Sequence, residues 1–237
     1  MMKTIARGHT IRLTCATLAV ATLMTPLGAE ENEPTKRLQE ASAVFSEVMA
    51  TPDKGIPTDL LEKAHCIVIV PELKTAAFIV GGKYGKGYVS CRNKATSGWS
   101  APGAVRVEGG SVGFQIGASS TDLIMLVMSQ RGAEKLLESQ FTIGAGASAA
   151  AGPVGRTATA QTDAQLRADI LSWSRSQGLF AGIALEGATL RQDLDDNATL
   201  YGRKLETRDI VTTGVVVPDA AGALLALLNR YSTKERS

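Results

Sequence analysis

The chain has 237 residues, 44% of which are hydrophobic, and its formal net charge at pH 7 is +2. A chain of this kind can bury a substantial core, and one domain of about 200 residues buries apolar surface more economically than two small domains. The nearly balanced charge excludes a generally basic surface, and no basic run has the length that is typical of nucleic-acid binding. Any attraction to an anionic partner must therefore come from local clusters of cations.

The first 29 residues differ from the rest of the chain. Lys3, Arg7 and Arg12 precede an apolar run, and Ala29 is a small residue suited to cleavage just before an acidic cluster. This order predicts a secretory signal peptide. An uncleaved membrane anchor is the alternative, but the run contains Pro26 and is shorter than the roughly 18 residues that a spanning helix needs. Cleavage would lower the basic count from 25 to 22 against 23 acidic residues, which leaves a nearly neutral chain.

The part after this segment begins with two predicted helices. From Thr35 to Ala50, apolar residues recur at helical spacing and charged residues occupy the rest of the helical wheel. The pattern is typical of an amphipathic helix, which either covers a sheet or contacts another surface. A short helix over 59–64 is predicted next, because Asp59 with Glu62 three residues later has the pattern of a capping box.

Two cysteines lie in the predicted strands that follow. Short apolar runs at 66–70, 76–80 and 87–91, separated by turn-like residues, predict a three-strand meander. A meander would place Cys66 and Cys91 at opposite ends of the strands, more than about 10 Å apart, which is beyond the span of a disulfide. We therefore expect two free, half-buried thiols, although an oxidising compartment would permit a bridge.

The remaining pattern predicts more strands and a closing helix. Strands are expected over 105–119, 121–129 and 178–190, the second of them buried because its apolar residues are continuous. A short helix is expected over 131–139 and a final one, which begins with proline, over 218–231. This order indicates an α+β fold: a single domain with a largely antiparallel, glycine-rich sheet, packed by the N-terminal amphipathic helix and the C-terminal helix.

We accordingly divide the chain into four parts. They are a signal peptide (1–29), a short acidic segment (30–34), a single domain (35–233) and a C-terminal tail (234–237). Within the domain, no repeat holds a fixed period, and no stretch has the composition of a linker.

Glycine recurs at strand spacing in several of the predicted strands. Within 112–117, bulky side chains alternate with Gly113, Gln115 and Gly117, which predicts one bulky face and one nearly bare face. Gly182 belongs to a second such pattern, and residues 141–159 are small on both faces. Because a bare face admits a close neighbour, we expect another backbone or a helix to pack near these positions.

Side chains suited to catalysis or metal binding are scarce. His65 is the only histidine after the predicted signal peptide, it has no second histidine at metal-ligand spacing, and no GxSxG motif is present. Asp193, Asp195 and Asp196 lack the glycine and the closing glutamate of a calcium loop, so we interpret them as a solvated acidic turn that caps a helix. The sequence therefore predicts a protein that is not an enzyme and that carries no metal or cofactor.

Several of these segments together resemble a known family. The segments are 64–71, 109–119, 141–156, 172–190 and 201–205. In this order they resemble the SYLF family, over a region from about Arg37 to Tyr231. The resemblance implies one compact domain that binds phosphoinositides and other anionic lipids through its N-terminal helix and nearby basic residues, and yeast members also engage actin. Trp173 and Gln177 stand where the family usually has tyrosine and lysine, which argues against inositol-head specificity and actin binding here.

A candidate lipid-binding site follows from the residues and the resemblance. The segment Gly81–Gly87 predicts a hairpin turn that presents Lys83 and Lys86 around Tyr84, although an ordinary solvent-exposed turn fits the same pattern. The complete set of predicted lipid-binding residues is Lys36, Arg37, Lys83, Tyr84, Lys86, Lys94 and Trp99. The cations would contact lipid phosphates, and the two rings would lie at the membrane interface.

We therefore expect an exported, periplasmic protein that is peripheral on a membrane. It would bind anionic phospholipid at the surface of a cell-envelope membrane, through phosphoinositide-like or other phosphate head groups, and it would not bind nucleic acid. The alternative is a structural or protein-interaction module of the envelope that binds no lipid. A small-molecule hydrolase is the least supported hypothesis.

Overall fold

The computed structural model describes residues 32–51, 55–78, 80–93, 98–112, 117–145, 147–154, 167–176, 179–183, 185 and 187–232. The predicted signal peptide and C-terminal tail lie outside these residues, so their boundaries stay predictions.

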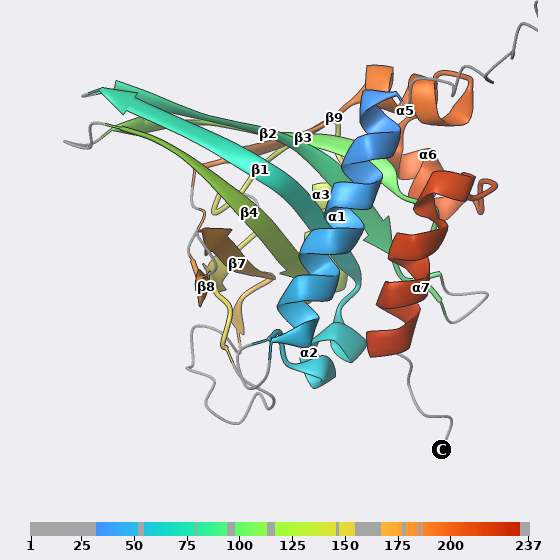
Figure 1. Ribbon diagram of the computed structural model, residues 1–237, viewed down its shortest axis with the longest axis horizontal. Coiled ribbons are helices and arrows are strands. Elements are labelled where there is room, and N and C mark those ends of the chain that lie inside the picture. Colours follow the sequence, from blue (N-terminus) through green and yellow to red (C-terminus); the bar gives the residue numbers. More distant parts are fainter. Residues whose placement is uncertain are drawn as a thin grey trace, which may run out of the picture. The chain divides into compact units, whose positions relative to one another are not determined.

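A nine-stranded sheet forms the centre of the fold (Figure 1), and its strands are ordered β5-β9-β3-β2-β1-β4-β7-β6, with β8 paired to β7. The strands are β1 (Cys66–Phe78), β2 (Val80–Cys91), β3 (Gly103–Val112), β4 (Gly117–Val127), β5 (Gln140–Thr142), β6 (Ala149–Ala151), β7 (Ile170–Ser176), β8 (Leu179–Gly182) and β9 (Thr189–Gln192). Every pairing is antiparallel except that of β6 with β7. The predicted α+β fold with a largely antiparallel sheet is confirmed.

The helices are α1 (Glu33–Ala50), α2 (Thr58–Lys63), α3 (Gln130–Leu136), α5 (Leu194–Tyr201), α6 (Thr207–Thr212) and α7 (Gly222–Tyr231), the last preceded by the 3₁₀ turn η2 (Asp219–Ala221). The N-terminal and C-terminal helices, α1 and α7, lie side by side (Figure 1), and the rings of Phe45 and Tyr231 meet edge to face with centroids 6.0 Å apart. The helices predicted near residues 35–50, 59–64, 131–139 and 218–231 are thus present. The capping box is wrong: Asp59 lies inside α2, whose N-cap residue is Pro57.

Both faces of the sheet are buried where β1 begins, because neighbouring residues of a strand point to opposite sides. Ile67 and Ile69 belong to an apolar cluster with α1, α2 and α7, in which Phe45 is fully buried. Val68 and Val70 belong to a second cluster, formed with β3, β5, β9 and α3. The apolar side of α1 is therefore used to cover the sheet.

The predicted three-strand meander is wrong, because the segment forms two long strands, β1 and β2. β1 runs without interruption through residues 71–75, where its register shifts, and Glu72 takes a φ of +50°. The chain thus reverses once between Cys66 and Cys91 instead of twice, and a single reversal brings the two ends together. The two cysteines are direct partners across β1 and β2.

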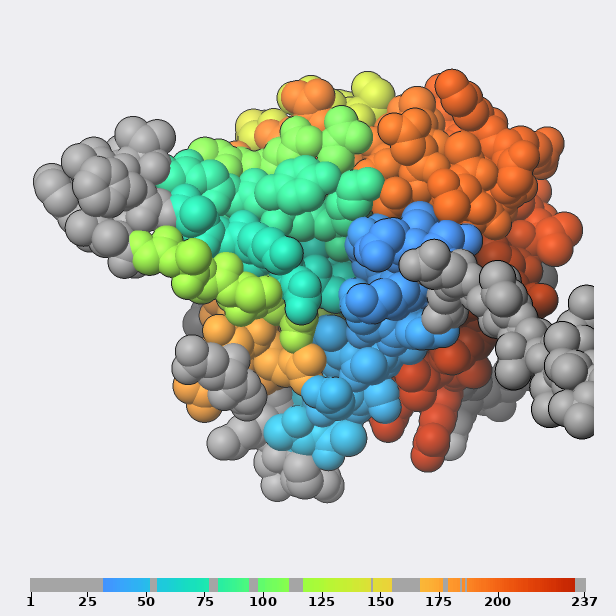
Figure 2. Space-filling model, turned by 45° about the horizontal axis from the view of Figure 1, so that its top comes forward, coloured from blue at the N-terminus to red at the C-terminus, as the bar shows by residue number. Residues whose placement is uncertain are grey.

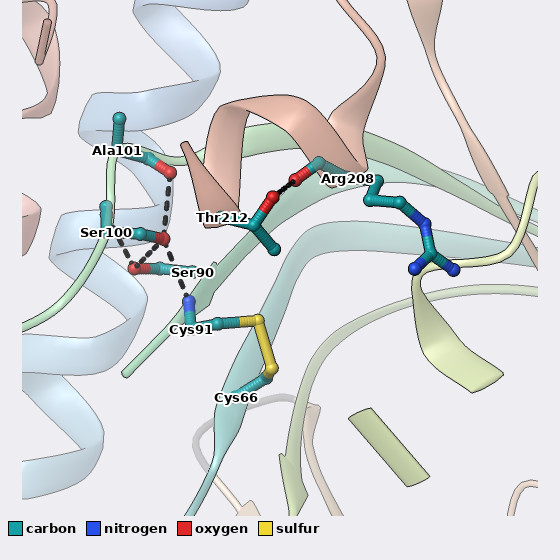
Figure 3. Close-up of a disulfide and its surroundings, with 7 residues drawn as sticks. All are labelled: Cys66, Ser90, Cys91, Ser100, Ala101, Arg208 and Thr212. Atoms are coloured by element: carbon teal, nitrogen blue, oxygen red, sulfur yellow. Dashed lines mark hydrogen bonds between the residues drawn. A yellow bond between two sulfur atoms is a disulfide. The ribbon is translucent and has the colours of Figure 1, made fainter. Parts of the chain in front are cut away.

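Cys66 and Cys91 form a disulfide, with their Cα atoms 3.9 Å apart (Figure 3). Arg92 donates a backbone hydrogen bond to His65. The cysteines are therefore the neighbouring, non-hydrogen-bonded pair, in which cross-strand side chains come closest. The backbone N–H of Cys91 instead donates to Ser100 Oγ at 3.0 Å (Figure 3). Both cysteines are buried, so the prediction of two free, half-buried thiols is wrong.

Candidate functional site

Two of the predicted lipid-binding cations lie in a partly buried charge cluster that joins α1, β2 and α5. Lys86 Nζ is 2.8 Å from Asp193 Oδ2 and 3.0 Å from Asp196 Oδ1. Arg37 Nη1 is 2.7 Å from Asp196 Oδ2. Because each cation already has a carboxylate partner, a lipid phosphate would have to displace that partner. Arg37 of α1 and Lys86 of β2 are thus linked through the carboxylates at the start of α5.

The protonation of this cluster agrees with such a role. Burial lowers the pKa of Lys86, but hydrogen bonds and charge interactions with Asp193 and Asp196 outweigh it, so the pKa is raised overall. For Asp193, burial raises the pKa, but the hydrogen bond from Lys86 and one from a backbone N–H dominate and lower it. Both groups are therefore charged at neutral pH.

Asp193 also shows where the sequence interpretation was right and where it was wrong. Its carboxylate accepts the backbone N–H of Asp196 at 3.1 Å and caps α5, as predicted. The predicted solvation is wrong for Asp193, whose side chain is only 3% exposed, and for Asp196, at 13%, whereas Asp195 is exposed. Lys86, from a distant part of the sequence, pairs with both Asp193 and Asp196, and Arg37 pairs with Asp196.

A second set of contacts fastens the other end of α1. Arg175 of β7 donates to Asp122 of β4 through Nε at 2.9 Å and through Nη2 at 2.7 Å, and its Nη1 pairs with Glu47 of α1. The helix is therefore held by ion pairs near both of its ends as well as by its apolar side. No local sequence pattern indicates this group, because Arg175 lies 128 residues from Glu47 and 53 residues from Asp122 in the chain.

Trp99 is a core residue and not an interfacial ring. It is 5% exposed, its Nε1 donates to Ser232 Oγ at 2.8 Å, and the Arg92 guanidinium carbon lies 4.3 Å from the ring centre. Lys94 lies outside the described residues. Lys36 is exposed at the start of α1, 4.0 Å from Glu40 one turn later.

The segment Gly81–Gly87 is part of strand β2 and not a hairpin turn. Lys83 has cross-strand partners on both sides, Thr75 in β1 and Gly109 in β3, so it lies within the paired part of the sheet. A Cβ atom placed on Gly87 would lie 2.1 Å from the carbonyl oxygen of Ile69. A glycine is thus required here, because the β1 backbone approaches β2 closely where the register between the two strands shifts. The glycine spacing that suggested a flexible turn reflects this approach.

Lys83 and Tyr84 belong to a surface that we call the distal sheet end. It consists of Lys74–Ala76, Gly81–Tyr84, Glu108–Gly110 and Gly117–Ser120. Figure 2 shows it in teal and green, projecting beyond α1 in blue. Most of its residues are small and many are exposed, and Tyr84 is 48% exposed.

The distal sheet end carries cations on both faces. Lys74 and Tyr84 are direct cross-strand partners and share one face, whereas Lys83 projects from the other. Within the described part of the chain, neither lysine takes part in an ion pair. Lys74 was not among the predicted site residues, because residues 71–75 were expected to form a turn between strands.

Other kinds of site have little support among the described residues. No group of three histidine, cysteine or acidic side chains there is arranged to hold a metal ion. No described helix has both the length and the apolar character that crossing a membrane requires.

Comparison with known proteins gives consistent matches. The family profile described as "Ysc84: Las17-binding protein actin regulator" matches residues 108–231. Protein YSC84 of Saccharomyces cerevisiae is 33% identical over 179 residues, which cover 74% of this chain and 38% of the yeast protein. SH3 domain-containing YSC84-like protein 1 of Rattus norvegicus is 31% identical over 211 residues, which cover 88% of this chain and 60% of the rat protein.

A third relative is LAS seventeen-binding protein 3 of Saccharomyces cerevisiae, 32% identical over 179 residues that cover 74% of this chain and 39% of the yeast protein. The chain thus spans between 38% and 60% of the length of these relatives. The matched region contains β4, β7, β9 and the helices α5 to α7. This chain belongs to the Ysc84 family, the SYLF family that its glycine-rich segments resemble.

Proposed function

We propose that this protein is a non-enzymatic binding module that associates with anionic phospholipid surfaces through its distal sheet end. The observation that carries the proposal is the presence of Lys74, Lys83 and Tyr84 on an exposed part of the sheet, with both lysines free of ion pairs within the described residues. Because Lys74 and Lys83 project from opposite faces, the end of the sheet would meet the membrane edge-on, and its small residues leave both side chains room to reach it. Long lysine side chains reach lipid phosphates, and a tyrosine ring suits the interface between lipid and water.

The proposed site differs from the set expected from the sequence. Arg37 and Lys86 are paired with carboxylates, and Trp99 is buried, so these three residues are assigned to stability. Lys36 remains as an exposed cation on α1. The lipid contacts are thus assigned to Lys74, Lys83 and Tyr84, with Lys36 as an additional cation.

The proposed location is the periplasm, at a membrane surface. The signal-peptide pattern at the N-terminus supports it, and so does the Cys66–Cys91 disulfide, because disulfides persist in oxidising compartments. A nearly neutral exported chain would associate reversibly, through few cations.

A protein partner is the second candidate. The family description and one relative are named for binding Las17, which is a protein. An exposed sheet surface with small side chains suits a protein partner as well as a lipid surface. In that case the distal sheet end would be the protein-interaction surface of an envelope module.

Flotation with vesicles tests the lipid proposal. The exported protein is mixed at low salt with phosphatidylcholine vesicles that contain or lack phosphatidylglycerol, and we expect flotation only with the anionic lipid. Each cation near an anionic surface contributes about 1 kcal/mol, so Lys74→Glu with Lys83→Glu should weaken binding at least about tenfold. Salt should weaken binding by the wild type as well.

The matched control is Lys63→Glu with Lys135→Glu, which changes the net charge equally on α2 and α3. It should bind nearly as well as the wild type. If the wild type does not float, the lipid proposal is lost and the protein-interaction module becomes the leading function. If the wild type floats and both double variants bind equally well, the lipid is right and the surface is wrong.

A further inference from the structure

The loop that joins α6 to η2 carries exposed apolar side chains. In this loop, residues Thr213–Pro218, Val216 is 85% exposed and Val217 is 39% exposed. Val216 is the most exposed of the large apolar side chains in the described part of the chain. Singly scattered apolar residues are ordinary on a protein surface, whereas contiguous exposed apolar residues rimmed by polar groups mark interaction sites.

The loop has a defined shape. Gly214 takes a φ of +71°, which favours glycine and turns the chain sharply after α6. Thr213 donates from its backbone and from its hydroxyl to the carbonyl of Asp209, at 3.0 and 2.7 Å. At the other end, Ala221 donates to the carbonyl of Pro218 at 2.9 Å. Both ends of the loop are thus fixed, and the valines are held outward.

Cations lie beside the valines. α5 is followed by Gly202, whose φ of +68° turns the chain, and Arg203 lines a groove together with the loop. The groove has a volume of about 590 Å³, and its lining includes Leu200, Tyr201 and Val215–Pro218. Arg203 and its neighbour Lys204 are exposed, and neither takes part in an ion pair within the described residues.

An apolar tip flanked by free cations matches the two-layered chemistry of an anionic bilayer surface. We propose that the loop Thr213–Pro218 is a second membrane contact. In it, Val216 and Val217 enter the interfacial layer of an anionic phospholipid membrane, while Arg203 and Lys204 contact lipid phosphates. The inference rests on the proposed function for its ligand class, but it uses different residues.

The two lipid contacts are separable by mutation. The loop lies beside α6 and α7, and the distal sheet end lies at the other end of the molecule (Figure 1). Asp219, which is exposed just after the loop, opposes an anionic surface. Neutralising the Asp219 carboxylate should therefore strengthen binding to anionic vesicles, whereas the other substitutions in this loop should weaken it.

Insertion is tested with a Val216→Trp variant and vesicles of phosphatidylglycerol and brominated phosphatidylcholine. The native Trp99 and Trp173 are 5% and 0% exposed, so they should be shielded from the bromine atoms. We expect lipid-dependent quenching and a blue shift of the added tryptophan. A variant that floats with the vesicles without quenching would overturn the inference.

Affinity is tested with Val216→Asp, which should weaken association about tenfold or more, because it removes an apolar contact and adds a negative charge. Val154→Asp is the matched control, since Val154 is also exposed, at 41%, and lies elsewhere. Arg203→Glu with Lys204→Glu should weaken binding at least about tenfold at low salt, and Asp219→Asn should strengthen it up to about fivefold. Unchanged denaturation midpoints would show that the variants fold.

The outcomes separate this inference from the proposed function. If the wild type does not float with anionic vesicles, both the proposed function and the loop contact are overturned. A wild type that floats and is weakened by the Lys74 and Lys83 changes, but not by Val216→Asp, overturns the loop contact and keeps the proposed function. If Val216→Asp leaves flotation unchanged and abolishes a dimer of the wild type, the loop binds a second copy of the chain, and the inference is overturned.

Discussion

Glycines occupy opposite environments in two regions of this sheet. Around β7 and β8, a Cβ atom placed on Gly182 would lie 2.1 Å from the carbonyl oxygen of Gly152, and one placed on Gly152 would lie 2.0 Å from the Trp173 ring. In the distal sheet end, a Cβ atom on Gly110 would meet no atom of the described residues within 4 Å. The same residue type therefore permits close packing in one region and leaves the surface open in the other.

The predictions made from glycine spacing are right in one of these regions and wrong in the other. A close neighbour was expected at Gly113, Gly117 and Gly182. Gly182 confirms it, Gly117 contradicts it because no described residue lies within 4 Å of its Cβ position, and Gly113 lies outside the described residues. Spacing indicates a strand with little side-chain volume, but not whether another part of the chain fills the space.

The largest expected effect is at Gly182. Gly182→Ala would add a carbon where the Gly152 backbone already lies, and backbone cannot move aside as a flexible side chain can. We expect a loss of at least about 3 kcal/mol in the free energy of unfolding, or no folded protein. Gly110→Ala is the matched control and should change it by less than about 0.5 kcal/mol. Urea denaturation checks both, and equal midpoints would mean that the two regions are packed alike.

Removal of the disulfide should have the next largest effect on stability. The bond links β1 and β2 at their packed end, and the distal sheet end has no such link among the described residues. Cys66 and Cys91 are 25 residues apart, a loop for which a disulfide contributes about 3 kcal/mol. Replacing both cysteines by alanine should lower the free energy of unfolding by about this amount.

A reducing agent should reproduce the loss in the wild type and should not affect the double variant further. Thiol titration of the unfolded, unreduced wild type should find neither Cys66 nor Cys91 free. Two titratable thiols, or a wild type that is insensitive to reduction, would refute the pairing.

A third prediction compares two lysines of β2 that lie three residues apart. Lys86→Met would leave Asp193 and Asp196 with one cation, Arg37, between them. Because Lys86 is 26% exposed, we expect a loss of about 2 kcal/mol, below the range for fully buried pairs. Lys83→Met, in the distal sheet end, should change stability by less than about 0.5 kcal/mol. Losses of equal size at both positions would show that the cluster does not stabilise the fold.

The smallest effect is a pH dependence of the same cluster. Asp193 has a lowered pKa, so its contribution is present above its unfolded pKa of about 4 and is lost as the pH falls through its folded pKa. Lys86 has a raised pKa, so its contribution is present below about pH 10.5 and is lost as the pH rises through its folded pKa.

Asp193→Asn should therefore flatten the acid side of the stability profile, measured by urea denaturation between about pH 2 and pH 6. The control is Asp195→Asn, at an exposed position of the same helix. If the two variants lose stability equally as the pH falls, the lowered pKa of Asp193 does not contribute to the stability of the fold.

The fold was predictable wherever a local pattern has one structural solution. Leu38, Phe45 and Val48 recur at helical spacing, and α1 buries them. The continuous apolar end of β4 is fully buried, as expected. The hairpin was not predictable, because residues 71–75 have the composition of a turn and remain in β1 only through the pairing of their neighbours with β2 and β4.

The candidate site was predictable only in part, and for a related reason. Residue type identified Lys83 and Tyr84 as groups suited to a lipid surface, and both lie in the distal sheet end. It also selected Arg37, whose partner Asp196 lies 159 residues further along the chain. No local pattern distinguishes a cation with a distant carboxylate partner from one that faces solvent.

The sequence by itself determined the family, the class of fold, the positions of the main helices and the scarcity of catalytic side chains, because each of these depends on residue types and on spacings within a short segment. Only the tertiary structure decided that the two cysteines are partners, which cations remain unpaired and which glycines are covered. These features depend on contacts between residues that are distant in the chain, and such contacts exist only after the strands have paired.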